Sequence, residues 1–119
     1  MISLPAAIQF AEGGVLSRPL LTAPGARVVL FTFAEGQELT AHTSSRRALV
    51  QILSGKCDFQ FDKKWHPLEA GAFLQLPPNH LHAVRATSSP CALLLILCDE
   101  PGPSPARRKL AAKATRNIS

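Results

Sequence analysis

The chain has 119 residues, which is enough for one domain with a hydrophobic core and too few for two domains of ordinary size. Its hydrophobic content of 46% against 18% charged residues excludes a disordered chain. The net charge of +5 lies entirely in residues 101–119, which carry five bases and no acid, whereas residues 1–100 carry eight of each. We therefore expect no nucleic-acid partner for the body of the protein.

The three cysteines show no CxxC spacing, so we expect reduced thiols in a cytoplasmic protein. The first residues, MISLPAAIQFA, lack the basic start of a signal peptide. No apolar run approaches the ~18 residues of a membrane helix, so we expect no membrane partner.

Short apolar runs separated by Gly, Pro, Asn and Ser recur along the chain and predict strands. In chain order they are RVVLFTF, ALVQILSG, CDFQF, AFLQLPP, HAVRA and CALLLILC. Alternation is clearest in CDFQF, where Cys57, Phe59 and Phe61 share one face. The pattern predicts an all-β barrel or sandwich with one face of each strand inside.

A hairpin is predicted at residues 61–66, which join two runs, and no helix is predicted before residue 100. After that point the composition changes to PGPSPARRKLAAKATRNIS. Ser104 can cap a short helix that begins at Pro105. The sequence thus predicts a barrel domain over residues 1–100 and a basic tail over residues 101–119, flexible or lightly docked.

Two histidines stand in LQLPPNHLHAV, where His80 and His82 are two residues apart. On a strand this spacing places both on one face, which suits a metal pair. The Pro-Pro-Asn turn places His80 outside the strand instead, where this alternation does not hold. Both interpretations of His80, third metal ligand or turn residue, stay open.

The segment GQELTAHTSSRRALVQILSG resembles the first motif of the cupin superfamily, whose members are small β-barrels. That motif runs Gly, five residues, His, any residue, His, then a Glu and a Gly. Gly36, His42 and Gly55 match it here, whereas Ser44 stands for the second histidine and Ala48 for the glutamate.

The segment GAFLQLPPNHLHAVRA resembles the second cupin motif in the same register. Gly71, Pro77 and His82 match, whereas Asn79 replaces a glycine and Ala86 an asparagine. The resemblance implies a single cupin barrel, also called a double-stranded β-helix or jelly roll.

The resemblance also implies a divalent metal, Fe, Mn, Ni or Zn, held by three histidines and one glutamate. Of these four ligand positions, only those of His42 and His82 hold a metal-binding residue in this sequence. His80 is a possible substitute for one of the missing ligands. Losing two ligands should lower metal affinity by at least ~100-fold. Without a metal, the two imidazoles can contact a small molecule inside the barrel or can be structural remnants.

The expected ligand-contacting positions are those of the first motif and its inward-facing strand, together with the second motif's histidine. They are His42, Ser44, Ala48, Val50 and His82. A small-molecule-binding barrel is the first prediction. A metal-dependent cupin enzyme of dioxygenase or isomerase type and a ligand-sensing regulator are the alternatives. Pairing through sheet edges makes a homodimer the expected assembly, partly on the family resemblance.

Overall fold

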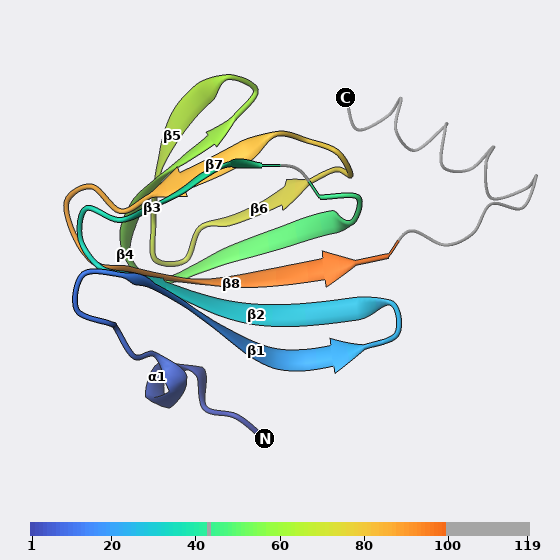
Figure 1. Cartoon of the computed structure of the whole chain (residues 1–119), viewed down its shortest axis with the longest axis horizontal. Helices are drawn as coiled ribbons and strands as arrows, with labels where there is room; N and C mark the ends of the chain where they lie inside the picture. The colour runs from blue at the N-terminus through green and yellow to red at the C-terminus, as the bar shows by residue number, and fades with distance from the viewer. Residues whose placement is uncertain (43, 100–119) are drawn as a thin grey trace, which may run out of the picture.

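A computed structural model describes residues 1–42 and 44–99 (Figure 1). It contains one short helix and eight strands: α1 (Leu4–Ala7), β1 (Val15–Ala23), β2 (Ala26–Phe33), β3 (Glu38–His42), β4 (Arg47–Phe61), β5 (Lys64–Glu69), β6 (Phe73–Leu76), β7 (His82–Arg85) and β8 (Cys91–Cys98). The predicted all-β class is confirmed.

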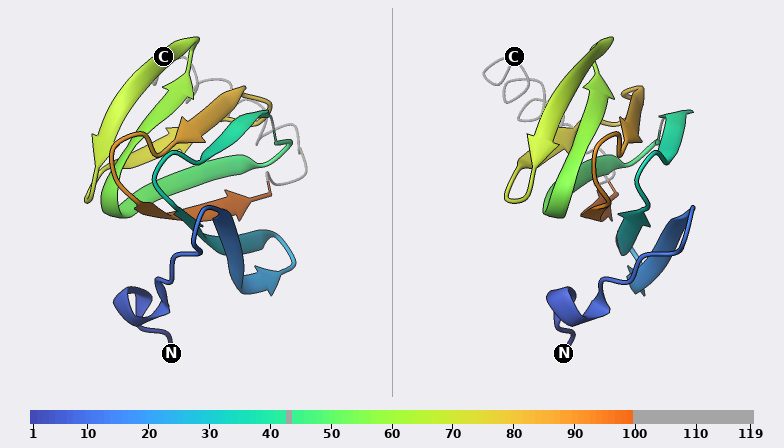
Figure 2. Two further views of the ribbon diagram at one scale, coloured as in Figure 1. Left: turned by 60° about the vertical axis from the view of Figure 1, so that its left-hand side comes forward. Right: turned by 90° about the vertical axis from the view of Figure 1, so that its left-hand side faces the viewer.

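All strand pairs are antiparallel, and the sheet curls into the barrel of a double-stranded β-helix. The strand order is β1-β2-β8-β4-β7-β3, while β5 and β6 pair with β4. The long strand β4 belongs to both halves, because its first part pairs with β8 and β6 and its second part with β5 and β7. Figure 2 shows the sheet curving around the interior in two further views.

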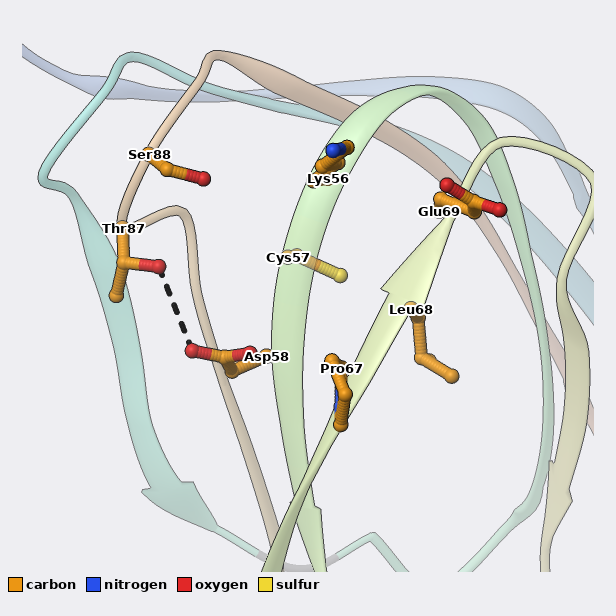
Figure 3. A pocket seen from close by; sticks show the side chains of 8 residues that line it. All are labelled: Lys56, Cys57, Asp58, Pro67, Leu68, Glu69, Thr87 and Ser88. Atoms are coloured by element: carbon orange, nitrogen blue, oxygen red, sulfur yellow. Dashed lines mark hydrogen bonds between the residues drawn. The ribbon is translucent and has the colours of Figure 1, made fainter.

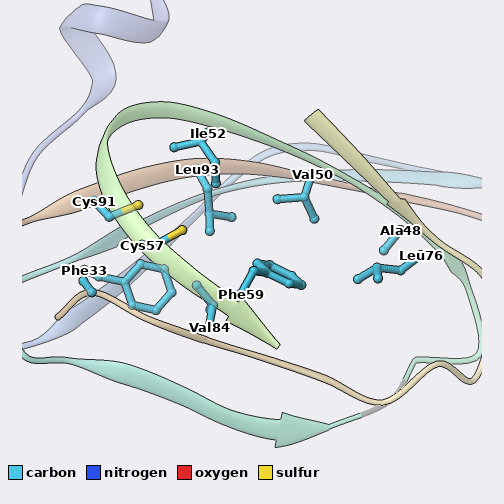
Figure 4. Close-up of a cluster of buried hydrophobic side chains, with 11 residues drawn as sticks. Phe33, Ala48, Val50, Ile52, Cys57, Phe59, Leu76, Val84, Cys91 and Leu93 are labelled. Carbon is cyan, nitrogen blue, oxygen red and sulfur yellow. The ribbon is translucent and has the colours of Figure 1, made fainter. Parts of the chain in front are cut away.

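The core fills the inside of this curl, as Figure 4 shows. Its buried members come from β2, β4, β6, β7 and β8 and from the residue after β7: Phe33, Ala48, Val50, Ile52, Cys57, Phe59, Leu76, Val84, Ala86, Cys91 and Leu93. Alternation produces this set, since successive side chains of a strand point to opposite faces. The predicted inward face of Ala48, Val50 and Ile52 is confirmed, because each is at most 2% exposed.

The two predicted runs ALVQILSG and CDFQF merge into one strand, β4, which curves sharply between Ile52 and Cys57, the segment that contains Gly55 (Figure 4). Gly55 has a φ of +75°, which a residue with a side chain adopts only with strain. An added Cβ would lie 1.9 Å from the backbone oxygen of Pro90. The corner of the barrel therefore depends on a glycine at this position.

The predicted hairpin at residues 61–66 is confirmed as the turn between β4 and β5. Asp62 and Lys63 form its two-residue connection with φ values of +53° and +64°. Positive φ at both positions is typical of a type I′ turn, which suits the twist of a hairpin. Phe61 pairs with Lys64, and this register fixes which residues of β5 face inward.

The expectation of no helix before residue 100 is wrong, because α1 forms one helical turn with a proline in its first turn. Four residues are too few to show a helical period in the sequence. The segment packs on the outside of the sheet: Ala7 is buried, and Thr32 Oγ1 donates to the carbonyl oxygen of Gln9 over 2.8 Å. Strands β1, β3 and β5 were not among the predicted runs, so the predicted hairpin joins β4 to β5 and not to the run AFLQLPP.

Within the described residues, no helix is long and apolar enough to cross a membrane. The basic tail over residues 101–119, its predicted helix and its boundary with the barrel lie outside the described residues. They stay predictions.

Candidate functional site

His82 is the buried histidine of the barrel, at the first position of β7 with 7% of its surface exposed. Its ring stacks on Phe59, with 5.9 Å between the centroids and 13° between the planes. Its Nδ1 lies 2.9 Å from the backbone oxygen of His80. Stacking and hydrogen bond together fix the orientation of the imidazole.

The partner of Nδ1 determines the tautomer of the neutral ring. A carbonyl oxygen only accepts hydrogen bonds, so Nδ1 of His82 carries the proton and donates it to His80. Nε2 of the neutral ring is then the acceptor. An Nε2 oriented in this way can accept a hydrogen bond from a hydroxyl group or coordinate a metal.

A narrow cavity lies beside this ring in the barrel interior. It is lined by Phe31, Phe33, Leu39, Val50, Phe59, His82, Val84, Leu93 and Leu95. The space between these side chains is about 310 Å³, but only about 20 Å³ of it admits the centres of water-sized molecules. That is room for about one water in the present conformation. His82 is the polar side chain among these lining residues, so it determines which ligands are recognised there.

The second predicted histidine, His42, ends β3, and its backbone pairs in register with that of His82. Positions directly opposite in an antiparallel pair are neighbours on one face of the sheet. The structure therefore places the two motif histidines at adjacent positions of the barrel wall, although 40 residues separate them in the sequence.

Of the other three predicted contact positions, two lie in the barrel interior and one lies in a loop. Val50 lines the cavity beside His82, and Ala48 lies in the core opposite Leu76. Ser44 lies in the loop before β4, where its Oγ accepts a hydrogen bond from the backbone N–H of Arg46 at 3.1 Å. Its carbonyl oxygen accepts from the backbone of Asn79 at 2.7 Å. Ser44 thus joins the two loops that carry the motifs.

His80 belongs to the loop before β7 and not to the strand. Its Nε2 lies 2.9 Å from Oδ1 of Asp62, whose side chain is 70% exposed. This contact ties the β4–β5 turn to the β6–β7 loop. The described geometry thus uses the ring of His80 for a loop contact and its carbonyl oxygen for the orientation of His82.

His66 is a further interior histidine that the sequence interpretation left without a role. It stacks on Phe61 with 3.9 Å between centroids and 13° between planes. Its Nε2 is buried and has no hydrogen-bond partner among the described residues. A buried ring nitrogen without a partner costs about 1–3 kcal/mol, so such an atom invites a functional explanation.

Register counting could have found His66. Phe61 pairs with Lys64 across the two-residue turn, which sets His66 opposite Phe59 on the inward face. His82 pairs with Phe61 on the other side of β4. The two imidazoles therefore flank the Phe59–Phe61 pair from β5 and β7, strands about 10 Å apart at two sheet spacings.

A wider groove lies between β4, just after Gly55, and the end of β5 (Figure 3). It is lined by Lys56, Cys57, Asp58, Pro67, Leu68, Glu69, Thr87 and Ser88, and admits water-sized centres over about 320 Å³. Asp58 is already engaged, by Thr87 Oγ1 and by Arg85 Nε, each at 3.4 Å. We favour the space beside His82 as the binding site because apolar side chains and one oriented imidazole line it.

The residues present do not fit the four-ligand metal site that the fold family implies. Alanine at position 48 has no donor atom, and the Oγ of Ser44 is used by Arg46. Among the described residues, no group of three or more His, Cys, Asp or Glu side chains could hold a metal ion.

Comparison with known proteins identifies the family. A model of the cupin domain matches residues 29–97, and the chain belongs to the cupin superfamily. No curated protein matches the chain.

Solved structures with the same fold include proteins from several bacteria. A conserved protein of unknown function from Streptococcus pyogenes is 24% identical, with a TM-score of 0.77 over 86% of this chain and 89% of its own. A cupin superfamily protein from Desulfitobacterium hafniense is 26% identical, with a TM-score of 0.77 over 83% and 90%. A cupin 2 conserved barrel domain protein from Leptotrichia buccalis is 30% identical, with a TM-score of 0.78 over 82% of this chain and 47% of its own.

Proposed function

We propose that this cupin binds a small polar molecule inside its barrel, at the cavity beside His82. The observation that carries the proposal is the oriented imidazole: His82 is buried among apolar side chains, stacked on Phe59 and held by the carbonyl oxygen of His80. A few placed polar groups in an apolar enclosure are typical of ligand sites. His42, at the neighbouring position of the wall, is the second proposed contact.

The cavity limits the size of the ligand and the tautomer limits its chemistry. Only about 20 Å³ of the cavity admits the centres of water-sized molecules, far below the roughly 300–1,000 Å³ of ligand pockets, so the ligand has few non-hydrogen atoms and enters only as lining side chains move. Phe31, Leu39 and Leu95 are the partly buried lining side chains that would move to admit it. Because Nε2 of neutral His82 accepts, the ligand presents a hydroxyl or another donor to it.

His66 is the third proposed polar contact, for a ligand that extends along Phe59 and Phe61. Its buried Nε2 has no partner among the described side chains and backbone groups. A hydrogen bond from a bound molecule would remove that cost. The proposed ligand therefore has polar groups at two separated points.

A matched pair of probes tests the site. L-lactate and pyruvate have the same carbon skeleton, but only lactate has a hydroxyl donor. Calorimetric titration should show lactate binding at least about 10-fold more tightly than pyruvate, because a site built around a hydroxyl rejects an analogue without it. His82→Phe should abolish the difference, whereas His80→Gln, which keeps the carbonyl partner, should retain it. Equal affinity for both probes in the wild type would contradict the proposal.

A divalent-metal enzyme is the second candidate, and the adjacency of His42 and His82 in register favours it. Two imidazoles with waters completing the shell can hold Fe, Mn, Ni or Zn weakly. Elemental analysis of untagged protein, purified without chelating resin, tests this. Near-stoichiometric metal that disappears in both His42→Ala and His82→Ala would support the enzyme; protein that stays metal-free at saturating metal would exclude it.

We also propose a homodimer and a cytoplasmic location. Strand β1 is an edge strand of the sheet, and it exposes Leu16 at 42% and Leu21 at 50%. Unpaired edges of this kind are ready sites for pairing with a second copy. Light scattering of the purified protein tests the dimer: twice the chain mass supports it, and a monomer at micromolar concentration contradicts it. The free thiols support a reducing compartment.

A further inference from the structure

Two of the three cysteines lie close together inside the barrel, although they are far apart in the sequence. Cys57 lies in β4 just beyond the bend, and Cys91 is the first residue of β8. Their exposed fractions are 3% and 0%. Figure 4 shows the two side chains lying side by side in the core, and the pKa of each thiol is shifted by the other.

The bend at Gly55 explains this meeting. Cys91 pairs in register with Gly55, which has no side chain to occupy the inward position opposite it. The next inward position on β4 is Cys57. On a flat sheet such diagonal neighbours are about 7–8 Å apart between Cα atoms, slightly too far for a disulfide. The curvature of β4 and the close packing of Gly55 against Pro90 and Cys91 depart from a flat sheet, and we infer that they bring the two cysteines within this limit.

Cys57 is also reachable from outside the core. It lies in the wall of the open groove between β5 and the β7–β8 loop, next to Leu68 and Lys56 (Figure 3). That groove admits molecules well above the size of water. Of the two thiols, only Cys57 borders this groove, so we infer that a small oxidant reaches Cys57 first, through a local opening at this 3% exposed residue, and that Cys91 reacts through Cys57.

We propose that Cys57 and Cys91 are a redox-active dithiol that a peroxide converts to a disulfide across the corner of the barrel. The thiolate of Cys57 attacks one peroxide oxygen, so an S–O bond forms, the O–O bond breaks and the leaving hydroxide takes a proton to become water. The sulfur of Cys91 then attacks the sulfenic acid of Cys57, which forms the S–S bond and releases a second water. Two thiols thus supply the two electrons that reduce one hydrogen peroxide to two waters.

The electrostatics agree with this order of events. The hydrogen bond from Cys91 lowers the pKa of the Cys57 thiol, while burial and Asp58 oppose that effect. The same hydrogen bond, together with burial, raises the pKa of Cys91. Together with the position of Cys57 beside the groove, this assigns Cys57 as the attacking thiolate and Cys91 as the resolving thiol.

The chain supplies its own matched control, since Cys98 is partly exposed, free and separate from the pair. Intact protein treated with hydrogen peroxide should lose about 2 Da, regain it with dithiothreitol, and yield a linked Cys57–Cys91 peptide on digestion. One thiol should remain titratable after denaturation. Cys98→Ser should lose the same mass, whereas Cys91→Ser should gain oxygen at Cys57 and Cys57→Ser should leave Cys91 reduced.

The mapping on wild-type protein decides the proposal even if a buried serine prevents folding. Peroxide-treated wild type in which Cys57 and Cys91 stay reduced, or become oxygenated without linking, would overturn it. So would a disulfide that involves Cys98.

Discussion

Replacement of Gly55 by alanine tests the corner on which both halves of the barrel depend. The substitution places a Cβ at a φ of +75°, which costs about 1–2 kcal/mol for an L-residue. The new atom lies 1.9 Å from the oxygen of Pro90, so the backbone must move by at least 1.1 Å, the difference from the 3.0 Å limit of real contacts. Forced packing of this kind costs about 1–3 kcal/mol more.

The expected loss is therefore about 2–5 kcal/mol, a large part of the ~5–15 kcal/mol that stabilises a typical domain. Urea denaturation followed by circular dichroism measures it. Gly36→Ala is the matched control, because Gly36 also has a positive φ, +86°, but nothing lies within 4 Å of its added Cβ. A loss for Gly55→Ala within about 0.5 kcal/mol of the control would refute the role of close approach at the corner.

Four further substitutions each test a different feature of the structure. His66→Phe should raise the melting temperature, because it removes a buried nitrogen without a partner among the described residues; an unchanged or lower melting temperature would contradict the cost assigned to that nitrogen. Ile52→Ala should cost about 2–5 kcal/mol in urea, and a loss below about 1 kcal/mol would contradict its place in the core. Arg85→Ala should cost about 1 kcal/mol and change the emission of Trp65, the one tryptophan, since its guanidinium lies 3.8 Å from the ring centroid; Arg18→Ala should leave the emission unchanged. Thr32→Val should release the N-terminal segment from the sheet and speed its proteolysis, and equal cleavage rates would show that the contact with Gln9 does not hold it.

The interior of the barrel was predictable where motif spacing and strand parity agree. Gly55 and Gly71 fix the register of the two motifs, and this register predicts an inward place for His82 and for Val50. For these two residues, the alternation of side chains along a strand is enough to predict the inward face. A shift of the strand pairing by one residue would turn the whole apolar face to solvent.

Other features depend on contacts that spacing does not contain. His66 follows an exposed tryptophan and a polar turn, so its surroundings in sequence indicate surface, although its register with Phe59 turns it inward. The meeting of Cys57 with Cys91 follows from a bend of β4, and a linear pattern does not show bends. The single turn of α1 is held by packing on the sheet and not by propensity.

The nitrogen resonances of the His82 ring test the central claim most directly. We expect a proton on Nδ1 in the free protein, and an Nε2 signal that shifts saturably when lactate is added but much less with pyruvate. A ring protonated on Nε2 alone, or an Nε2 signal that neither probe moves, would contradict the proposed site.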